Sequence, residues 1–154
     1  MTAGLFSLRR TLGRIRSNSL WYVTTGNGCC ADEVLMAMGC RYDLERFGCV
    51  HEVDAGKADL LIVNGIVTRK SAPALRELYD KMVAPKYVMA LGACACTGGP
   101  FCPELSYATV GGAEKVIPVD VFVPGCPPRP EAIMNGLINL QEKIRGSGIS
   151  EIVH

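Results

Sequence analysis

Leu60-Leu61-Ile62-Val63-Asn64 is an unbroken apolar run that ends in one polar residue. Strands buried on both faces of a parallel sheet have such runs, because neither face meets water. Residues 86–91 and 119–123 repeat this pattern, and residues 19–24 are aromatic and β-branched. The sequence therefore predicts a central, mainly parallel β-sheet.

Segments with helical features separate these strands. Residues 31–39 begin with acidic side chains, which favour a helix N-terminus through the helix dipole. Ser71 is a candidate N-cap for a helix over residues 72–82, and residues 130–143 carry apolar side chains at helical spacing. Strands that alternate with helices predict an α/β fold with a doubly wound sheet.

The remaining segments have weaker patterns. A further strand is expected near residues 49–53, and residues 98–112 are expected to be mostly loop, with a short helix near 105–110. The length of 154 residues and the apolar content of 49% suit one domain with one core. We expect that domain to span residues 19–146, with residues 147–154 as a C-terminal tail.

Residues 1–18 form a basic arm, because Arg9, Arg10, Arg14 and Arg16 lie in it and no acidic residue does. Apolar residues alternate with these arginines and predict a short amphipathic helix on a membrane surface or a partner. A targeting peptide and a solvated basic tail are the alternatives. The net charge of the whole chain is only +1, so no nucleic-acid partner is expected.

The eight cysteines need an explanation that fits their surroundings. The sequence has no apolar run long enough to cross a membrane and no pattern of a secretory signal. We therefore expect the reducing cytoplasm, where metal binding is a better use of cysteine than disulfide bonds.

Four of the cysteines directly follow predicted strands. Cys29 and Cys30 follow the first strand, Cys94 follows the strand at residues 86–91, and Cys126 follows the last strand. The carboxyl ends of parallel strands meet at one edge of a sheet, so we expect these thiols to converge. Four convergent thiolates form a metal site, and an iron–sulfur cluster is the favoured kind.

Zinc and free buried thiols are the alternatives to a cluster. Structural zinc sites normally use two close pairs of cysteines on small knuckles, and this sequence lacks that spacing. Free cysteines would act as small apolar residues in the core. Cys40 and Cys49 are predicted to do so. Cys96 and Cys102 share the loop of Cys94, and either is a candidate to replace it as a ligand.

The adjacent pair Cys29 and Cys30 is awkward for one cluster, because neighbouring side chains in an extended segment point to opposite sides. We expect Gly26 and Gly28 to allow a locally contorted loop there. The ligand-bearing segments are expected to be loops whose free backbone N–H groups face the cluster, and not helix caps.

Four stretches form a specific combination: Gly28-Cys29-Cys30-Ala31-Asp32-Glu33, Arg41-Tyr42-Asp43-Leu44-Glu45-Arg46-Phe47-Gly48, Gly92-Ala93-Cys94-Ala95 and Pro124-Gly125-Cys126-Pro127-Pro128-Arg129-Pro130-Glu131-Ala132. With further matches over residues 18–144, they resemble the complex I subunit that carries the terminal 4Fe-4S cluster, the 20 kDa subunit family of NADH-quinone oxidoreductase. The resemblance implies a flavodoxin-like fold and one 4Fe-4S cluster, with Cys29, Cys30, Cys94 and Cys126 as its ligands.

The same superfamily includes the small subunits of membrane-bound NiFe hydrogenases. Their first two ligands resemble Cys-Asn-Gly-Cys, which would place a cysteine at position 27, where this chain has Asn27. The tandem pair is similar to complex I instead, whereas Gly26-Asn27-Gly28 and Val67-Thr68-Arg69 look closer to the hydrogenase branch. The chain looks intermediate, as in the archaeal membrane-bound complexes that reduce sulfane sulfur.

The resemblance implies an electron-transfer subunit of a membrane-bound oxidoreductase that is not catalytic alone. The implied partners are a large catalytic subunit, a ferredoxin-like iron–sulfur subunit and membrane-arm subunits, on the cytoplasmic face of the membrane. The acceptor would be quinone or sulfane sulfur. A hydrogenase small subunit and a cluster-free flavodoxin-like binding module are the alternatives; against the latter, Gly28-Cys29-Cys30-Ala31 offers thiols where a phosphate site needs a Ser/Thr/Gly loop.

Four charged or polar residues near these motifs have two interpretations each. Glu33 and Arg129 flank the ligand segments and either tune the cluster potential or act as a helix cap and a surface ion pair. Tyr42 and Arg69 either contact the large subunit or are ordinary surface residues.

Overall fold

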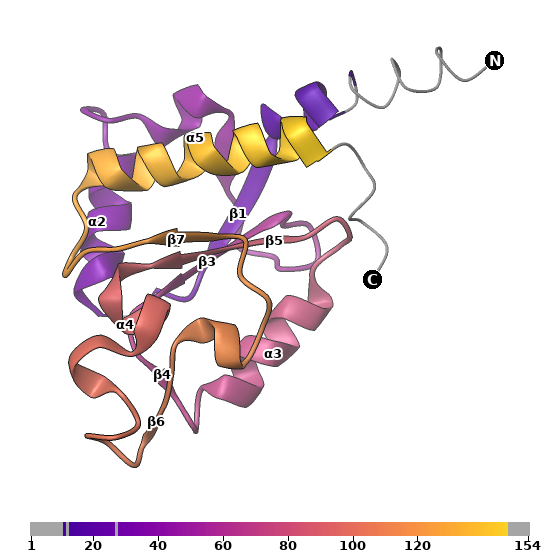
Figure 1. Cartoon of the computed structure of the whole chain (residues 1–154). Coiled ribbons are helices and arrows are strands. Elements are labelled where there is room, and N and C mark those ends of the chain that lie inside the picture. The colour runs from indigo at the N-terminus through magenta and orange to yellow at the C-terminus, as the bar shows by residue number, and fades with distance from the viewer. Residues whose placement is uncertain (1–10, 12, 27, 148–154) are drawn as a thin grey trace.

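A parallel sheet of five strands forms the centre of the protein in a computed structural model, which describes residue 11 and residues 13–26 and 28–147 (Figure 1). The strand order is β2-β1-β3-β5-β7, the order of the flavodoxin-like fold. The strands are β1 (Leu20–Thr24), β2 (Cys49–His51), β3 (Leu60–Asn64), β5 (Tyr87–Leu91) and β7 (Val121–Val123). The predicted α/β fold with a doubly wound sheet is confirmed.

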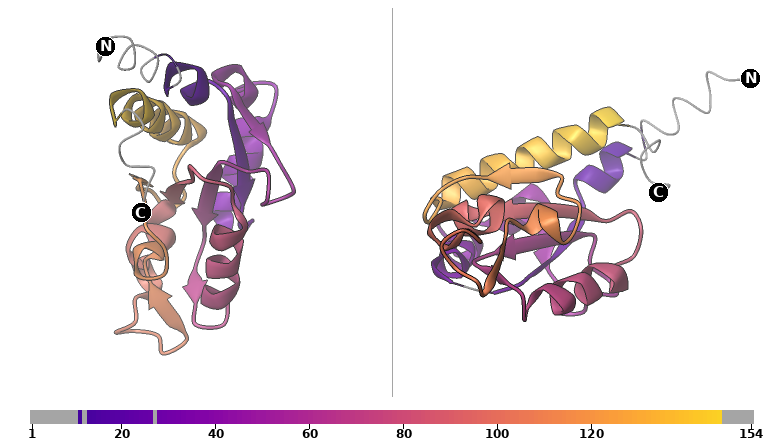
Figure 2. Two further views of the ribbon diagram at one scale, coloured as in Figure 1. Left: turned by 90° about the vertical axis from the view of Figure 1, so that its right-hand side faces the viewer. Right: turned by 60° about the horizontal axis from the view of Figure 1, so that its bottom comes forward.

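Helices cover both faces of this sheet. Figures 1 and 2 show α2 (Cys29–Met38) and α5 (Pro130–Ser147) on one face and α3 (Ala72–Lys81) on the other. The shorter elements are α4 (Gly92–Thr97) and the 3-10 turns η1 (Leu44–Phe47), η2 (Gly99–Phe101) and η3 (Ala113–Lys115). The carboxyl ends of the strands therefore lead into α2, α4 and the start of α5.

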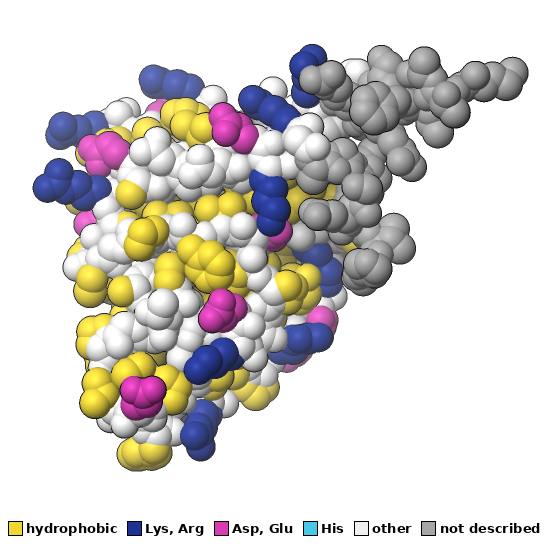
Figure 3. All heavy atoms as spheres, in the orientation of Figure 1, with side chains coloured by type: hydrophobic (Ala, Val, Ile, Leu, Met, Phe, Trp, Pro, Cys, Tyr) yellow, Lys and Arg dark blue, Asp and Glu magenta, His cyan; other side chains and the backbone are white. Residues whose placement is uncertain are grey.

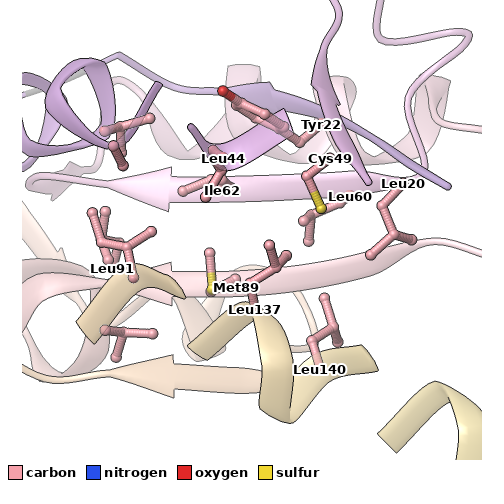
Figure 4. Packing of buried hydrophobic residues seen from close by; sticks show 14 of the residues in the cluster. Leu20, Tyr22, Leu44, Cys49, Leu60, Ile62, Met89, Leu91, Leu137 and Leu140 are labelled. Atoms are coloured by element: carbon pink, nitrogen blue, oxygen red, sulfur yellow. The ribbon is translucent and has the colours of Figure 1, made fainter. Parts of the chain in front are cut away.

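The central strand β3 is buried along its whole length, as its apolar run predicts. It pairs with β1 on one side and with β5 on the other. Because side chains alternate across a strand, Leu60 and Ile62 pack under α2 and α5, whereas Leu61 and Val63 face α3. Figure 4 shows the first of these two layers, where Leu140 of α5 points toward the sheet.

Replacement of Leu140 by Ala is expected to lower the free energy of unfolding by about 3 kcal/mol, because the fully buried side chain leaves a cavity between α5 and the sheet. Urea denaturation followed by circular dichroism would measure the loss. Asn139→Ala, at the neighbouring exposed position of the same helix, is the control and is expected to stay within about 0.5 kcal/mol of the parent. Equal losses for the two variants would contradict this packing.

The connection from β2 to β3 contains only turns, over residues 52–59. Trp21 of β1 is paired with Val50 of β2, and the two side chains are 41% and 40% exposed. Their neighbours Leu20 and Tyr22 point into the layer under α2 and α5, so Trp21 lies on the opposite face of the sheet. No helix connects β2 to β3, and this corner of the sheet keeps an exposed aromatic side chain.

Some predicted element bounds are wrong. The predicted helix near residues 105–110 is absent: Thr109–Gly111 is strand β6, which pairs antiparallel with β4 (Val67–Thr68). This pairing joins segments that are about 40 residues apart in the sequence, so no local sequence pattern indicates it. Ser71 occupies the N-cap position of α3, but its hydroxyl bonds with Thr68 and does not cap the helix. The last helix continues to Ser147, four residues past its predicted end.

The described end of the predicted N-terminal arm is helical and packs on the body of the domain. Ser17 is buried and accepts a hydrogen bond from Arg145 of α5 (2.9 Å), and Arg16 lies 3.5 Å from Asp59. The rest of the predicted amphipathic helix, and the tail after Ser147, lie outside the described residues, so the division at residues 18 and 146 remains a prediction. Among the described helices, none is long and apolar enough to cross a bilayer.

Candidate metal centre

The four cysteines predicted as ligands all lie just past the carboxyl ends of strands. Cys29 and Cys30 are the first two residues of α2 after β1, Cys94 is the third residue of α4 after β5, and Cys126 lies in the loop after β7. In the parallel order of this sheet these strand ends form one edge (Figure 1). The structure thus brings residues almost a hundred positions apart to the same side of the molecule.

The expectation that these cysteines lie in loops, and not at helix caps, is wrong for three of them. Gly28 is the N-cap residue of α2, with a φ of 68° that favours glycine, and the helix begins directly at Cys29. Successive residues of a helix are rotated by about 100°, not 180°, so Cys29 and Cys30 can face one space without a contorted extended loop. Cys29 is exposed and Cys30 is buried.

The thiol of Cys30 is the most enclosed of the four, with 3% of the residue exposed. The pKa of Cys30 is raised to about 11, mainly by burial and then by the nearby thiols of Cys29 and Cys94. A hydrogen bond from the backbone N–H of Gly65 to Cys30 acts in the opposite direction, because it favours the thiolate. Cys30 is therefore a neutral thiol at pH 7 unless a cation lies beside it.

Cys94 connects the two ends of the group. Burial raises the pKa of Cys94, and the thiols of Cys126 and Cys29 each add to this effect. Each of the four thiols thus interacts electrostatically with at least one of the others. A cation among them would reverse this effect, since metal ligation deprotonates a thiol.

Gly92 leaves open the space beside Cys30. A Cβ on Gly92 would lie 2.4 Å from the Sγ of Cys30, and the φ of Gly92 is +86°. The next residue, Ala93, donates its backbone N–H to the carbonyl of Gly125 at 2.7 Å. This bond holds the start of α4 against the loop that carries Cys126, so the absent side chain and the bond together bring three thiol-bearing segments close.

In the described part of the chain, no three His, Cys, Asp or Glu side chains are grouped closely enough to hold a single metal ion. A 4Fe-4S cluster binds one thiolate at each iron, so its ligands need not converge on one point. The donor set, four thiols with no carboxylate or imidazole among them, fits the soft ligands that iron–sulfur clusters use. The residues present therefore fit such a group.

The other cysteines lie in different environments. Cys96 is buried on the α3 side of the sheet, where its thiol donates to the carbonyls of Ala90 (3.5 Å) and Val123 (3.7 Å). Cys102 follows η2 and is half-buried. Cys40 is exposed, so its prediction as a core residue is wrong: α2 ends at Met38, and the chain turns outward after it. Cys49 is fully buried, as predicted.

Cys49 is expected to make the protein sensitive to alkali. Burial raises the pKa of Cys49 to about 12, whereas an unfolded thiol titrates near pH 9. Above pH 9 the unfolded state loses this proton and the folded state keeps it, so stability falls as the pH rises. Between pH 7 and pH 10, the parent protein should lose about 1.4 kcal/mol more than Cys49→Ala in urea denaturation. Parallel pH profiles for the two proteins would contradict the assignment.

Tyr42 and Glu131 form a contact that the sequence did not reveal. The hydroxyl of Tyr42 donates to the Oε1 of Glu131 at 3.0 Å, and the guanidinium of Arg41 lies 5.6 Å from the Tyr42 ring centre. The pKa of Glu131 is lowered, first by a hydrogen bond from its own backbone N–H and second by this contact with Tyr42. The contact joins the segment after α2 to the first turn of α5. Both residues lie in stretches that carry the family resemblance, which was the available signal.

Asn64 is a second residue that the sequence did not mark as part of the site. It ends the central strand at the same edge as the cysteines and is only 2% exposed. The hydroxyl of Thr25, which follows β1, donates to the Oδ1 of Asn64 at 2.6 Å. A buried polar residue at the end of an apolar run was the signal that could have identified it.

Large apolar side chains are exposed on the elements that carry or follow the thiols. They are Leu35 and Met36 of α2, at 63% and 66%, and Phe101, Leu105 and Tyr107 of the segment after α4, at 43%, 77% and 87%. Figure 3 shows hydrophobic side chains on the surface along the left and lower parts of the view, where these elements lie. Exposed apolar groups gathered in one region are typical of protein–protein interfaces.

An α/β protein with a group of thiols at the carboxyl edge of its sheet is the class that these observations define. The family described as NADH ubiquinone oxidoreductase, 20 Kd subunit, matches residues 27–140, and the chain belongs to this family. It is 50% identical over 141 residues to a subunit of the NADH-quinone oxidoreductase of Clostridium beijerinckii, over 91% of this chain and 82% of the relative. The corresponding subunit of Heliobacterium modesticaldum is 49% identical over 140 residues, with 90% and 79% covered.

Solved structures agree with this assignment. A chain of the membrane-bound sulfane sulfur reductase, an archaeal respiratory membrane complex, superposes with a TM-score of 0.81 at 38% identity, over 88% of this chain and 76% of that one. The NiFeSe hydrogenase of Desulfomicrobium baculatum superposes with a TM-score of 0.55 at 19% identity, over 84% and 64%, and shows only that the fold is shared. The predicted family is confirmed: the protein is a subunit of a complex I-like oxidoreductase.

Proposed function

We propose that this subunit carries one 4Fe-4S cluster on Cys29, Cys30, Cys94 and Cys126 and transfers single electrons through it. The observation that carries the proposal is the group of four thiols at one edge of the sheet, each of which interacts with at least one of the others. The cluster, when bound, supplies a one-electron redox centre. The chain supplies the four ligands, encloses one of them at Cys30, and presents the other side of the group to a partner.

The route of the electrons follows from the position of this edge. We propose that they arrive from a ferredoxin-like iron–sulfur subunit and leave to an acceptor at the interface with a large catalytic subunit. The exposed apolar residues Leu35 and Met36 lie on the helix that begins with Cys29, and Leu105 lies in the segment that follows the helix of Cys94; their exposure supports docking on these elements. Since Cys29 and Cys126 are themselves exposed, a docked partner would also exclude water from the centre.

The acceptor is proposed to be quinone or sulfane sulfur. The first is named in the relatives at 50% and 49% identity, and the second in the solved complex at 38% identity. Either acceptor site would be formed largely by the large subunit, so this chain is not proposed to be catalytic alone. We place the protein at the cytoplasmic face of the membrane as a peripheral subunit, held there by membrane-arm partners.

Anaerobic purification of the full chain followed by iron and sulfide analysis and EPR spectroscopy tests the cluster. We expect about four irons and four sulfides per chain and a signal from the reduced cluster after dithionite treatment. Zinc in place of iron would exclude the proposal, and so would a folded protein that takes up no metal on reconstitution. H₂ evolution by the assembled complex would identify a hydrogenase instead.

A further inference from the structure

Asn64, the last residue of the central strand, is held by hydrogen bonds with Thr24 and Thr25, and we call these three residues the clasp. The hydroxyl of Thr25 donates to the Oδ1 of Asn64 at 2.6 Å, and the same hydroxyl accepts the backbone N–H of Asn64 at 3.0 Å. The hydroxyl of Thr24 lies 3.2 Å from the same Oδ1. These contacts fix both the side chain and the backbone of Asn64 within the core, where it is 2% exposed.

The residue that follows the clasp, Gly65, lies close to the start of α2, which carries two of the thiols. Gly65 follows Asn64 directly, with a φ of 81°, and the Cβ position of Gly28 lies 3.5 Å from the Cα of Gly65. The start of α2 therefore lies close to the residue that follows β3, with room for little more than a methyl group between them. Cys30, the most buried of the four thiols, lies two residues after Gly28, and the backbone N–H of Gly65 acts on it as a hydrogen-bond donor that lowers the pKa of the thiol. The orientation of this N–H depends on the peptide plane between Asn64 and Gly65, which the clasp holds.

Resting on the cluster proposed above, we propose that Thr25 and Asn64 are positioning residues: they aim the N–H of Gly65 at the sulfur of Cys30 and so raise the reduction potential of the cluster. A reduced cluster carries one more negative charge than an oxidised one. Hydrogen bonds to its sulfurs therefore stabilise the reduced state more. Loss of the clasp should loosen the donor and make the cluster harder to reduce.

Thr25→Val tests this inference, because valine has the shape of threonine without the hydroxyl. Thr68→Val is the matched control: it removes a hydroxyl that bonds to Ser71 at 2.9 Å on β4, a strand outside the central sheet. Thr25→Ser keeps the hydroxyl and should restore the parent behaviour. Redox titration of the full chain, followed by EPR, measures the potential, and iron analysis shows whether each variant holds its cluster.

We expect the ratio of reduced to oxidised cluster at a fixed ambient potential to fall about tenfold in Thr25→Val, which corresponds to about 59 mV for one electron. Thr68→Val and Thr25→Ser should match the parent. Hydrogen exchange of the Gly65 amide in the metal-free chain is a second readout, expected to be about tenfold faster in Thr25→Val alone. This readout decides the outcome if Thr25→Val fails to keep its iron.

Two results would overturn the inference. The first is an unchanged potential in an iron-loaded Thr25→Val; the second is equal exchange of the Gly65 amide in Thr25→Val and Thr68→Val. Failure of the proposed function would look different, since the parent chain itself would then hold no iron. The measurements therefore separate a wrong role for Thr25 and Asn64 from a wrong cofactor.

Discussion

Cys94→Ala is expected to abolish the cluster, with the iron content falling from about four per chain to below one and the EPR signal of the reduced protein lost. Cys94 interacts with the thiols at both ends of the group, Cys126 and Cys29. Its loss therefore opens the middle of the ligand set, and no other described donor lies among these contacts. The fold should persist, because Cys94 is only half-buried. Iron analysis, EPR and circular dichroism after anaerobic purification measure these three properties.

Cys96→Ala is the matched control, two positions along the same short helix. Its thiol is buried on the other side of the sheet and bonds to the carbonyls of Ala90 and Val123. The variant should retain about four irons and lose about 1 kcal/mol of stability, the usual cost of a lost buried hydrogen bond. If instead the iron disappears from Cys96→Ala and stays in Cys94→Ala, the ligand assignment is wrong. Cys102→Ala tests the remaining candidate in the same way.

Gly92→Ala is expected to lower the iron content nearly as much as Cys94→Ala does, although it removes no ligand. The new Cβ would lie 2.4 Å from the Sγ of Cys30, and the φ of +86° is strained for any residue with a side chain. Relief requires Cys30 or the start of α4 to move, and both carry proposed ligands. We expect loss of most of the iron and a decrease of about 2–4 kcal/mol in the free energy of unfolding of the metal-free protein.

The same substitution at Gly146 controls for the added methyl group. Gly146 lies near the end of α5, with no heavy atom within 4 Å of its Cβ position. Gly146→Ala should keep all of its iron and stay within about 1 kcal/mol of the parent, on the stable side if it changes. Full iron occupancy in Gly92→Ala would show that the space beside Cys30 is not needed for the cluster.

Local pattern was sufficient where burial alone decides the structure. β3 occupies the predicted residues because its run of apolar side chains has one explanation, a strand covered on both faces. The predicted ends of the strands were less accurate, because the length of a strand depends on the residues of the adjacent strand with which it pairs. β7 begins at Val121, two residues after its predicted start, and it pairs with only three residues of β5. A sequence does not show how many partners the adjacent strand offers.

At the candidate site, the strand-end rule placed the four cysteines at one edge, but it did not describe their local backbone. The helix start at Cys29 depends on the φ of Gly28, which glycine permits and does not require. α4 was not predicted, because Gly92-Ala93-Cys94-Ala95-Cys96-Thr97 has no cap and no apolar period. Without that helix, the only reason to prefer Cys94 to Cys96 was its position nearer the strand end, whereas two helical positions rotate their side chains apart by about 200°.

The exposed corner between β1 and β2 gives the protein an intrinsic optical reporter. Trp21 is the sole tryptophan of the sequence, and 41% of it meets solvent. Its fluorescence would shift toward blue wherever another surface covers that corner and would stay unchanged otherwise. Titration with each neighbouring subunit would thus reveal, without a label, which of them contacts this side of the sheet.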